Sequence, residues 1–143
     1  PYEIQKKLEQ EIYDKYFSKF EFKKTKVLNL KQLRQCAKTH EIGIHTFCHG
    51  NMEFETNEFF INDLNKCINW FGDFLHFRPN IFAFANNSYN EDQINILKKM
   101  KFKHILLVND KYSKVENQIH HRFNFYADSF NAAIYKSVGN KLI

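Results

Sequence analysis

Two histidines four positions apart, His45 and His49, are the residues of this sequence best suited to chemistry. They lie in the stretch EIGIHTFCHGNM, positions 41–52, where an apolar, strand-like run reaches His45 and Gly50 follows His49. Neutral imidazoles are among the commonest zinc ligands, and a short loop that turns between two of them can hold both about 2.0–2.1 Å from one ion. The spacing therefore predicts His45 and His49 as metal ligands. An isolated H-x-x-x-H pattern also fits two polar residues in a surface turn.

The residues between the two histidines can support such a site. The hydroxyl of Thr46 can orient the loop, although threonine is also simply a good strand residue. Cys48 is either a soft metal ligand or a small buried residue, and we favour the second interpretation. The 3 cysteines of the chain form no spaced pair and no zinc-knuckle pattern, so we expect reduced thiols.

Around this motif, helical and strand patterns alternate along the chain. Amphipathic spacing and capping residues predict helices over about 2–20, 29–39, 57–75, 90–100 and 129–138, with Pro79 expected to stop the third. Apolar runs predict strands near 42–46, 80–85, 104–108 and 121–126. Continuous apolar strands joined by crossover helices indicate a mainly parallel sheet covered on both faces, as an α/β layer or as part of a barrel. Functional loops of such sheets follow the C-terminal ends of strands, which is where His45 to His49 would lie.

Composition narrows the class of protein. The chain has 143 residues, 43% hydrophobic and 17% aromatic, with only 4 Gly and 2 Pro, which indicates one globular domain. No apolar run approaches the roughly 20 residues of a membrane span, so we expect a soluble chain, cytoplasmic or associated with the cell envelope. The net charge of +5 comes from lysines scattered among acidic residues and from few arginines, which argues against a nucleic-acid partner. Oligomeric state is left open.

Three stretches, in this order, resemble the polysaccharide deacetylases of the carbohydrate esterase family 4 type. EIGIHTFCHGNM is similar to the family's H-[ST]-x-x-H metal motif and the strand before it. NIFAFANNSYNEDQINILKKMKFKHILLVND resembles its strand, P-Y-G-x-Y-N-type loop, and following helix and strand. HRFNFYADSFNAAIYKSVG resembles its closing strand and helix. Together they cover about 100 residues, from roughly 29 to 139.

The resemblance implies a fold, a metal and a set of site residues. The fold would be a partial, distorted (β/α) barrel with mainly parallel strands and crossover helices. A divalent metal, zinc above all, would be held by one Asp and two His, here His45 and His49, with Thr46 as the loop-stabilising hydroxyl. In the family the ion activates a water that attacks the acetamide carbonyl of an N-acetylated sugar. In place of the family's Pro-Tyr-Gly loop, the substrate loop would consist of Asn86, Asn87, Ser88 and Tyr89.

The sequence departs from the family at its catalytic groups. The family's first motif is an Asp-Asp pair that supplies the third metal ligand and the general base, and no such dipeptide occurs here. Because the amphipathic start PYEIQKKLEQEIYDKYF resembles the insertion that some members carry after their first strands, we favour a motif that lies upstream over a degenerate copy. Residues 1–143 then form a single polysaccharide-deacetylase-like domain that lacks its N-terminal strands, with 1–27 as a helical, insertion-like segment.

The catalytic residues stay unassigned at this level, since the family's late Leu-His motif is not found. Candidates by position are His104, His120 and His121, each of which also reads as an ordinary residue at a strand, and Asp110, which also fits a turn.

The leading hypothesis for the full-length protein is a metal-dependent hydrolase that removes N-acetyl groups from an amino-sugar polysaccharide or cell-surface glycan. Its partner would be a carbohydrate substrate that carries N-acetyl groups. One alternative is a catalytically degenerate deacetylase-like domain that binds glycan. The other is an unrelated basic α/β domain that contacts an acidic partner.

Overall fold

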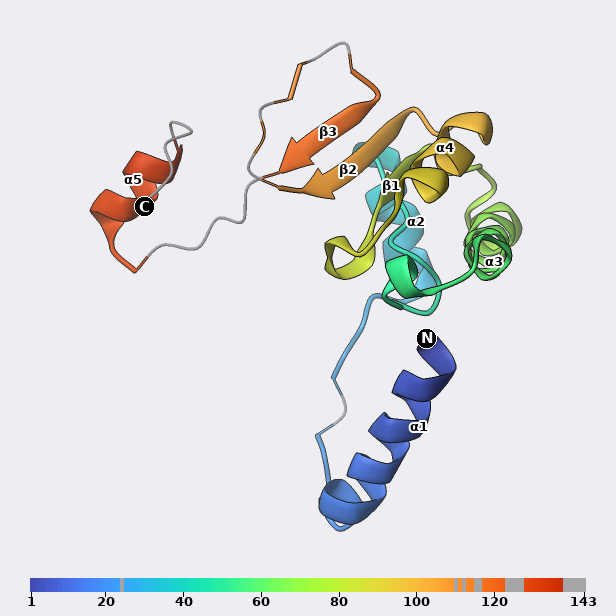
Figure 1. Cartoon of the computed structure of the whole chain (residues 1–143), viewed down its shortest axis with the longest axis vertical. Coiled ribbons are helices and arrows are strands. Elements are labelled where there is room, and N and C mark those ends of the chain that lie inside the picture. Colours follow the sequence, from blue (N-terminus) through green and yellow to red (C-terminus); the bar gives the residue numbers. More distant parts are fainter. Residues whose placement is uncertain (24, 110, 112, 115–116, 123–127, 138–143) are drawn as a thin grey trace.

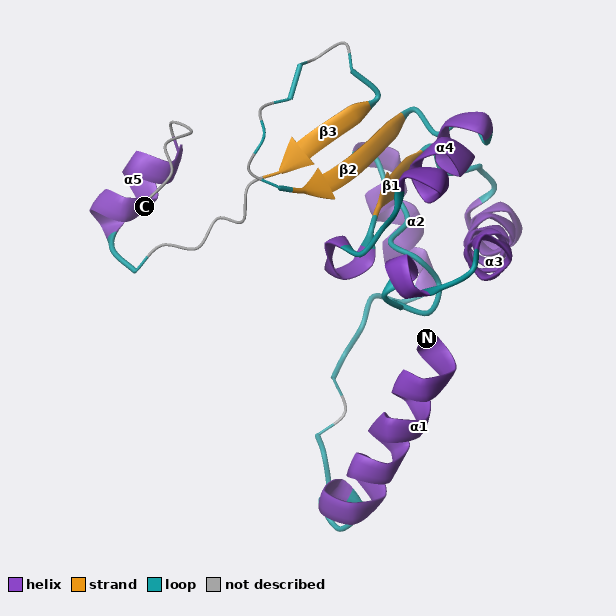
Figure 2. Cartoon of the chain, in the orientation of Figure 1, coloured by secondary structure: helices purple, strands orange, loops and turns teal. Residues whose placement is uncertain are grey.

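The structure is a computed structural model that describes residues 1–23, 25–109, 111, 113–114, 117–122 and 128–137. The helices are α1 (Tyr2–Ile12), α2 (Leu30–Thr39), α3 (Asn57–Leu75), α4 (Glu91–Lys99) and α5 (Phe130–Ser137). The strands are β1 (Ile81–Ala83), β2 (His104–Val108) and β3 (Ile119–Arg122). Three short turns of helix complete the elements: η1 (Tyr13–Phe17), η2 (Met52–Phe54) and η3 (Ala85–Asn87). Figure 1 shows this order along the chain, and Figure 2 distinguishes helices, strands and loops.

The three strands form one parallel sheet in the order β1-β2-β3, which confirms the predicted mainly parallel arrangement. The predicted strand near 42–46 is reduced to a single parallel bridge between Ile44 and Phe82 of β1. The strand predicted near 121–126 already begins at Ile119, and residues 123–126 lie outside the described part of the chain. The connection from β2 to β3 contains no helix among its described residues, so a helical crossover is not observed there.

The hydrophobic core lies between the sheet and the helices α3 and α4. It consists of Ile44, Met52, Phe60, Leu64, Cys67, Phe82, Phe84, Ile94, Leu97, Phe102, Ile105 and Leu107. Burial alternates along β1 and β2, so every second side chain of these strands faces away from this core and stays partly exposed. One face of the sheet is therefore covered by this core, and cover of the second face stays a prediction. In a closed (β/α) barrel the second face lines the interior, and three strands do not close a barrel.

Capping residues place the helix starts where the sequence predicted them. Asn29 and Asn90 each accept a hydrogen bond from a backbone N–H in the first turn, and each is part of a capping box with a glutamine. Thr56 caps α3 through the N–H of Phe59, 3.1 Å away. The end of α3 agrees with the prediction, but the residue that ends the helix differs. His76, with φ 62°, forms a left-handed C-cap, so the helix ends before Pro79 is reached.

Helix α1 matches its predicted start and amphipathic pattern, but none of its residues is buried. The side chains at its apolar positions are 58% exposed at Ile4, 52% at Leu8 and 51% at Ile12. Its first turn contacts the rest of the chain through Tyr2, whose ring lies 6.0 Å from that of Phe59. Figure 1 shows the remainder of the helix extending away from the sheet. Within the described residues, no helix combines the length and apolar character needed to cross a membrane.

Candidate functional site

Gly43 allows the segment before the two histidines to lie directly against β1. A Cβ atom at this position would stand 2.9 Å from the carbonyl oxygen of Ile81, closer than such atoms normally approach. With no side chain there, the N–H of Ile44 donates to Ile81 O at 2.9 Å, and the N–H of Ala83 donates to Ile44 O at 3.0 Å. His45, the next residue, is thereby placed at the C-terminal end of β1, where parallel sheets carry their functional loops.

The side chain of His45 is held by a backbone carbonyl. Its Nδ1 lies 2.8 Å from the oxygen of Ala83. Because a carbonyl oxygen can only accept, Nδ1 must carry the hydrogen, and the lone pair of the neutral ring is on Nε2. The side chain is exposed, so Nε2 is available to an incoming ligand. Metal-binding histidines are commonly oriented in this way, through the ring nitrogen that does not bind the metal.

The loop that follows brings His49 back beside His45. Thr46 and His49 both have left-handed backbone conformations, with φ 61° and 54°. For residues other than glycine such a conformation costs about 1–2 kcal/mol, so the surrounding structure must compensate for it. As a result, the two imidazole rings lie with their centroids 5.0 Å apart and their planes at 73°. The two predicted ligands are therefore side by side and both exposed.

Asp63 of α3 accepts two hydrogen bonds from the backbone of this loop. One carboxylate oxygen accepts the N–H of Phe47 at 2.7 Å and the other accepts the N–H of Cys48 at 2.9 Å. The residue is only 4% exposed. Sequence reasoning missed it, although a signal was present, because Asp63 lies within the apolar stripe of α3 that also contains Phe60 and Leu64. A carboxylate at a core position of a helix needs a polar partner.

The predicted substrate loop adopts the conformation expected for asparagines in place of glycine. Asn86 and Asn87 have φ 53° and 54°, which confirms that asparagine supports the left-handed turn here. The exposed Asn86 donates from Nδ2 to Oδ1 of Asn51 at 2.9 Å. Asn87 accepts the N–H of Val108 at 2.8 Å and so connects its loop to the end of β2.

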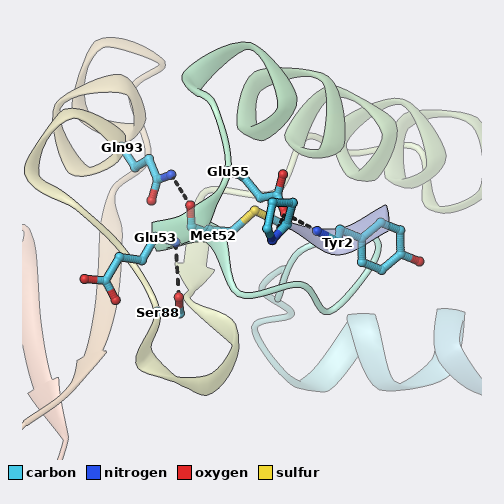
Figure 3. A network of polar contacts seen from close by, with 7 residues as sticks. Tyr2, Met52, Glu53, Glu55, Ser88 and Gln93 are labelled. Atoms are coloured by element: carbon cyan, nitrogen blue, oxygen red, sulfur yellow. Dashed lines mark hydrogen bonds and ion pairs between the residues drawn. The ribbon is translucent and has the colours of Figure 1, made fainter. Parts of the chain in front are cut away.

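Ser88 and Tyr89 of the same loop contact other residues of the protein. Ser88 is buried, and its Oγ accepts the N–H of Glu53 at 3.1 Å (Figure 3). The ring of Tyr89 lies 5.1 Å from that of the core residue Phe84. Of the four residues only Asn86 is exposed, and the substrate-loop assignment stays a prediction.

The turn η2 is tied to both α4 and α1. Gln93 of α4 is fully buried and donates from Nε2 to the carbonyl of Met52 at 2.6 Å. On the other side, the N–H of Tyr2 donates to the carboxylate of Glu55, as Figure 3 shows. Together with Ser88, these contacts fix the chain that follows His49.

Comparison with known proteins identifies the family. A family model described as polysaccharide deacetylase matches residues 13–105, more than half of the chain. The chain belongs to the polysaccharide deacetylase family. A solved structure of a de-N-acetylase from Aggregatibacter actinomycetemcomitans is similar, with a TM-score of 0.64 and 14% identity over 82% of this chain and 57% of that one. This likeness confirms the predicted partial α/β barrel, and the chain spans 57% of the length of that solved chain. Curated proteins gave no significant match.

In the described part of the chain, two residues of the loop between the two histidines, Thr46 and Cys48, lack the hydrogen bond expected of a loop anchor or the thiolate expected of a metal ligand. The hydroxyl of Thr46 is buried and has no hydrogen-bond partner among the described residues, so its loop-stabilising role stays a prediction. Burial, followed by the hydrogen bond with Asp63, raises the pKa of the Cys48 thiol to about 11. Since the thiolate is the form that binds metals, Cys48 at neutral pH has the properties of a small structural residue.

The other histidines lie away from this loop. His104, the first residue of β2, and His120 of β3 form a pair with 2.8 Å between Nδ1 and Nε2. His121 lines a cavity of about 480 Å³ between α4 and the edge of the sheet, and its Nδ1 has no partner among the described residues. Asp110 lies outside the described residues. Within the described part of the chain, no three His, Cys, Asp or Glu side chains are grouped so that they could hold a metal ion.

Proposed function

We propose that the full-length protein is a metal-dependent hydrolase that removes N-acetyl groups from an amino-sugar polysaccharide or cell-surface glycan. Membership of the polysaccharide deacetylase family and the fold shared with a de-N-acetylase support a deacetylase-type reaction. The observation that supports a bound metal is the geometry of the loop from His45 to His49. His45 presents a free Nε2, because Ala83 occupies its Nδ1, and the ring of His49 lies 5.0 Å away.

The two imidazoles are of the donor type that zinc binds, and they form part of a site. Two neutral imidazoles on one short loop supply two ligands, and catalytic zinc sites usually have three protein ligands. When bound, a divalent ion lowers the pKa of a water and polarises the acetamide carbonyl. The protein's own part is to hold Nε2 of His45 and the ring of His49 at one exposed point at the end of β1. The third ligand and the general base are unassigned, since the sequence contains no Asp-Asp pair.

Acetate release and metal content test the proposal. The full-length protein should bind one equivalent of Zn²⁺ or Co²⁺ and release acetate from N-acetylglucosamine oligomers. The variant with His45→Ala and His49→Ala should lose both properties, by at least about 100-fold in metal affinity, because changes outside the ligand set alone already cost 10–100-fold. Full deacetylase activity in this double variant would refute the proposal.

A degenerate, glycan-binding domain is the second candidate; it is the alternative to an Asp-Asp pair that lies upstream of Pro1. This candidate predicts that the full-length protein retains N-acetylated oligomers on an affinity column, with unchanged retention after chelation, and releases no acetate. The earlier alternative of an unrelated basic α/β domain is set aside by the family match.

A further inference from the structure

Asp63 is the one acidic side chain among the buried polar residues of the described chain, which are Asp63, Ser88 and Gln93. No ion pair to Asp63 is found among the described residues, where the only salt bridge joins Pro1 and Glu55. A buried carboxylate is unfavourable unless hydrogen bonds satisfy it. The groups that donate hydrogen bonds to Asp63 therefore indicate why a carboxylate is present in the core.

All the recorded donors to Asp63 come from the loop between the two histidines. The N–H groups of Phe47 and Cys48 donate to different carboxylate oxygens, at 2.7 and 2.9 Å. Hydrogen bonds to an ionised acceptor are stronger than those between neutral groups. The two residues directly before His49 are thus fixed to α3.

These two residues lie within the strained part of the loop. Thr46 and His49, which flank them, are the left-handed positions, with φ 61° and 54°. The direction of the His49 side chain follows from this backbone, and it places the ring 5.0 Å from that of His45. If Phe47 and Cys48 were released, the loop would be free to relax and the two rings to separate.

We infer that Asp63 is a positioning residue that holds the His45–His49 loop in its ligand-presenting conformation. The inference rests on the proposed metal function. The role assigned to Asp63 is positioning, because both of its oxygens accept backbone N–H groups of the loop and its side chain is only 4% exposed. Its effect on the metal is transmitted through the backbone between the two histidines.

The test compares Asp63→Asn and Asp63→Glu with the wild type in the full-length protein. Asparagine has nearly the same size but only one acceptor oxygen, so one of the two N–H groups loses its partner. We expect the Co²⁺ dissociation constant to rise about 10–100-fold, as it does when groups behind metal ligands are changed. Glutamate keeps both acceptor oxygens and the charge, and should restore affinity to within about 10-fold of the wild type.

A matched control separates positioning from simple destabilisation. Ile94 of α4 is 2% exposed and lies in the same core, away from the loop. Ile94→Val should lower the melting temperature yet leave the Co²⁺ dissociation constant within about twofold. Hydrogen exchange adds a readout that needs no metal. The amides of Phe47 and Cys48 should exchange at least about tenfold faster in Asp63→Asn and remain protected in Ile94→Val.

The outcomes are distinguishable. Wild-type affinity in Asp63→Asn, or unchanged exchange at Phe47 and Cys48, would overturn the positioning role while leaving the metal proposal intact. A wild-type protein that binds no metal would overturn the proposed function, whereas the exchange measurement would still decide whether Asp63 holds the loop. If Asp63→Asn does not fold, Asp63→Glu decides: affinity within about 10-fold of the wild type supports the positioning role, and a larger loss in this folded variant, which keeps both acceptor oxygens and the charge, would overturn it.

Discussion

The structure contains two histidine pairs with almost the same separation and different chemistry. The rings of His45 and His49 lie 5.0 Å apart, and those of His104 and His120 lie 4.9 Å apart. In the second pair, Nδ1 of one ring faces Nε2 of the other at 2.8 Å, so one nitrogen donates and the other accepts. In the first pair, the carbonyl of Ala83 occupies one nitrogen of His45, and no hydrogen bond between the two rings is recorded among the described residues.

The comparison shows that proximity alone does not make a metal site. A histidine binds a metal through a free lone pair, and in the His104–His120 hydrogen bond the accepting ring uses its lone pair, so only the donating ring retains one and the two neutral rings cannot bind one ion together. His45 instead has its tautomer set by a carbonyl, which leaves Nε2 free. Position agrees with this difference, since His45 lies at the C-terminal end of β1 whereas His104 is the first residue of β2.

Metal affinity should give the largest contrast between the pairs. His49→Ala is expected to raise the Zn²⁺ dissociation constant at least about 100-fold, because a ligand is lost and not merely a group behind one. His120→Ala should leave it within about twofold. Isothermal titration with both variants of the full-length protein makes the measurement. Equal losses in the two variants would show that the pairs do not differ in function.

The thiol inside the first pair should be unreactive. With a pKa raised from 9.0 to about 11, mainly by burial, Cys48 should be alkylated at pH 8 about 100-fold more slowly than in the urea-unfolded chain. Mass spectrometry of iodoacetamide-treated protein measures the rate. Labelling at the unfolded rate would make Cys48 a thiolate and a metal-ligand candidate again.

The raised pKa of Cys48 also predicts how the free energy of unfolding depends on pH. Below pH 9 the Cys48 thiol is protonated in both the folded and the unfolded chain, so it adds no pH dependence. Between pH 9 and about 11 the unfolded chain releases this proton while the folded chain retains it, and the free energy of unfolding should fall. Urea unfolding across this range, with Cys48→Ala as the control, isolates the contribution.

The coupling free energy between the two histidines of each pair should differ least between the pairs. A double-mutant cycle with His104→Ala and His120→Ala should show a coupling of about 0.5–1.5 kcal/mol in the free energy of unfolding, the usual net value of one hydrogen bond. The same cycle on His45 and His49 without metal should give a value near zero, because the rings share no recorded hydrogen bond. The reverse order would mean that the first pair is structural.

Local signals in the sequence were sufficient for most helices and for the histidine motif. The starts at Asn29, Thr56 and Asn90 follow from capping chemistry, which acts within three residues. The left-handed Asn86 and Asn87 were also foreseeable, because asparagine tolerates this conformation better than most residues. The strand predicted near 42–46 shows the limit, since its pairing was reduced to one bridge at Ile44.

By itself, the sequence determined where most helices begin, that the sheet is mainly parallel, and that His45 and His49 are four positions apart on one loop. Only the tertiary structure decided that Asp63 reaches that loop, that Ala83 sets the tautomer of His45, and that His104 and His120 bond to each other. Periodicity and capping depend on neighbours within a few residues. These contacts instead join residues 15 to 38 positions apart, and their geometry exists only once α3 and the strands have packed.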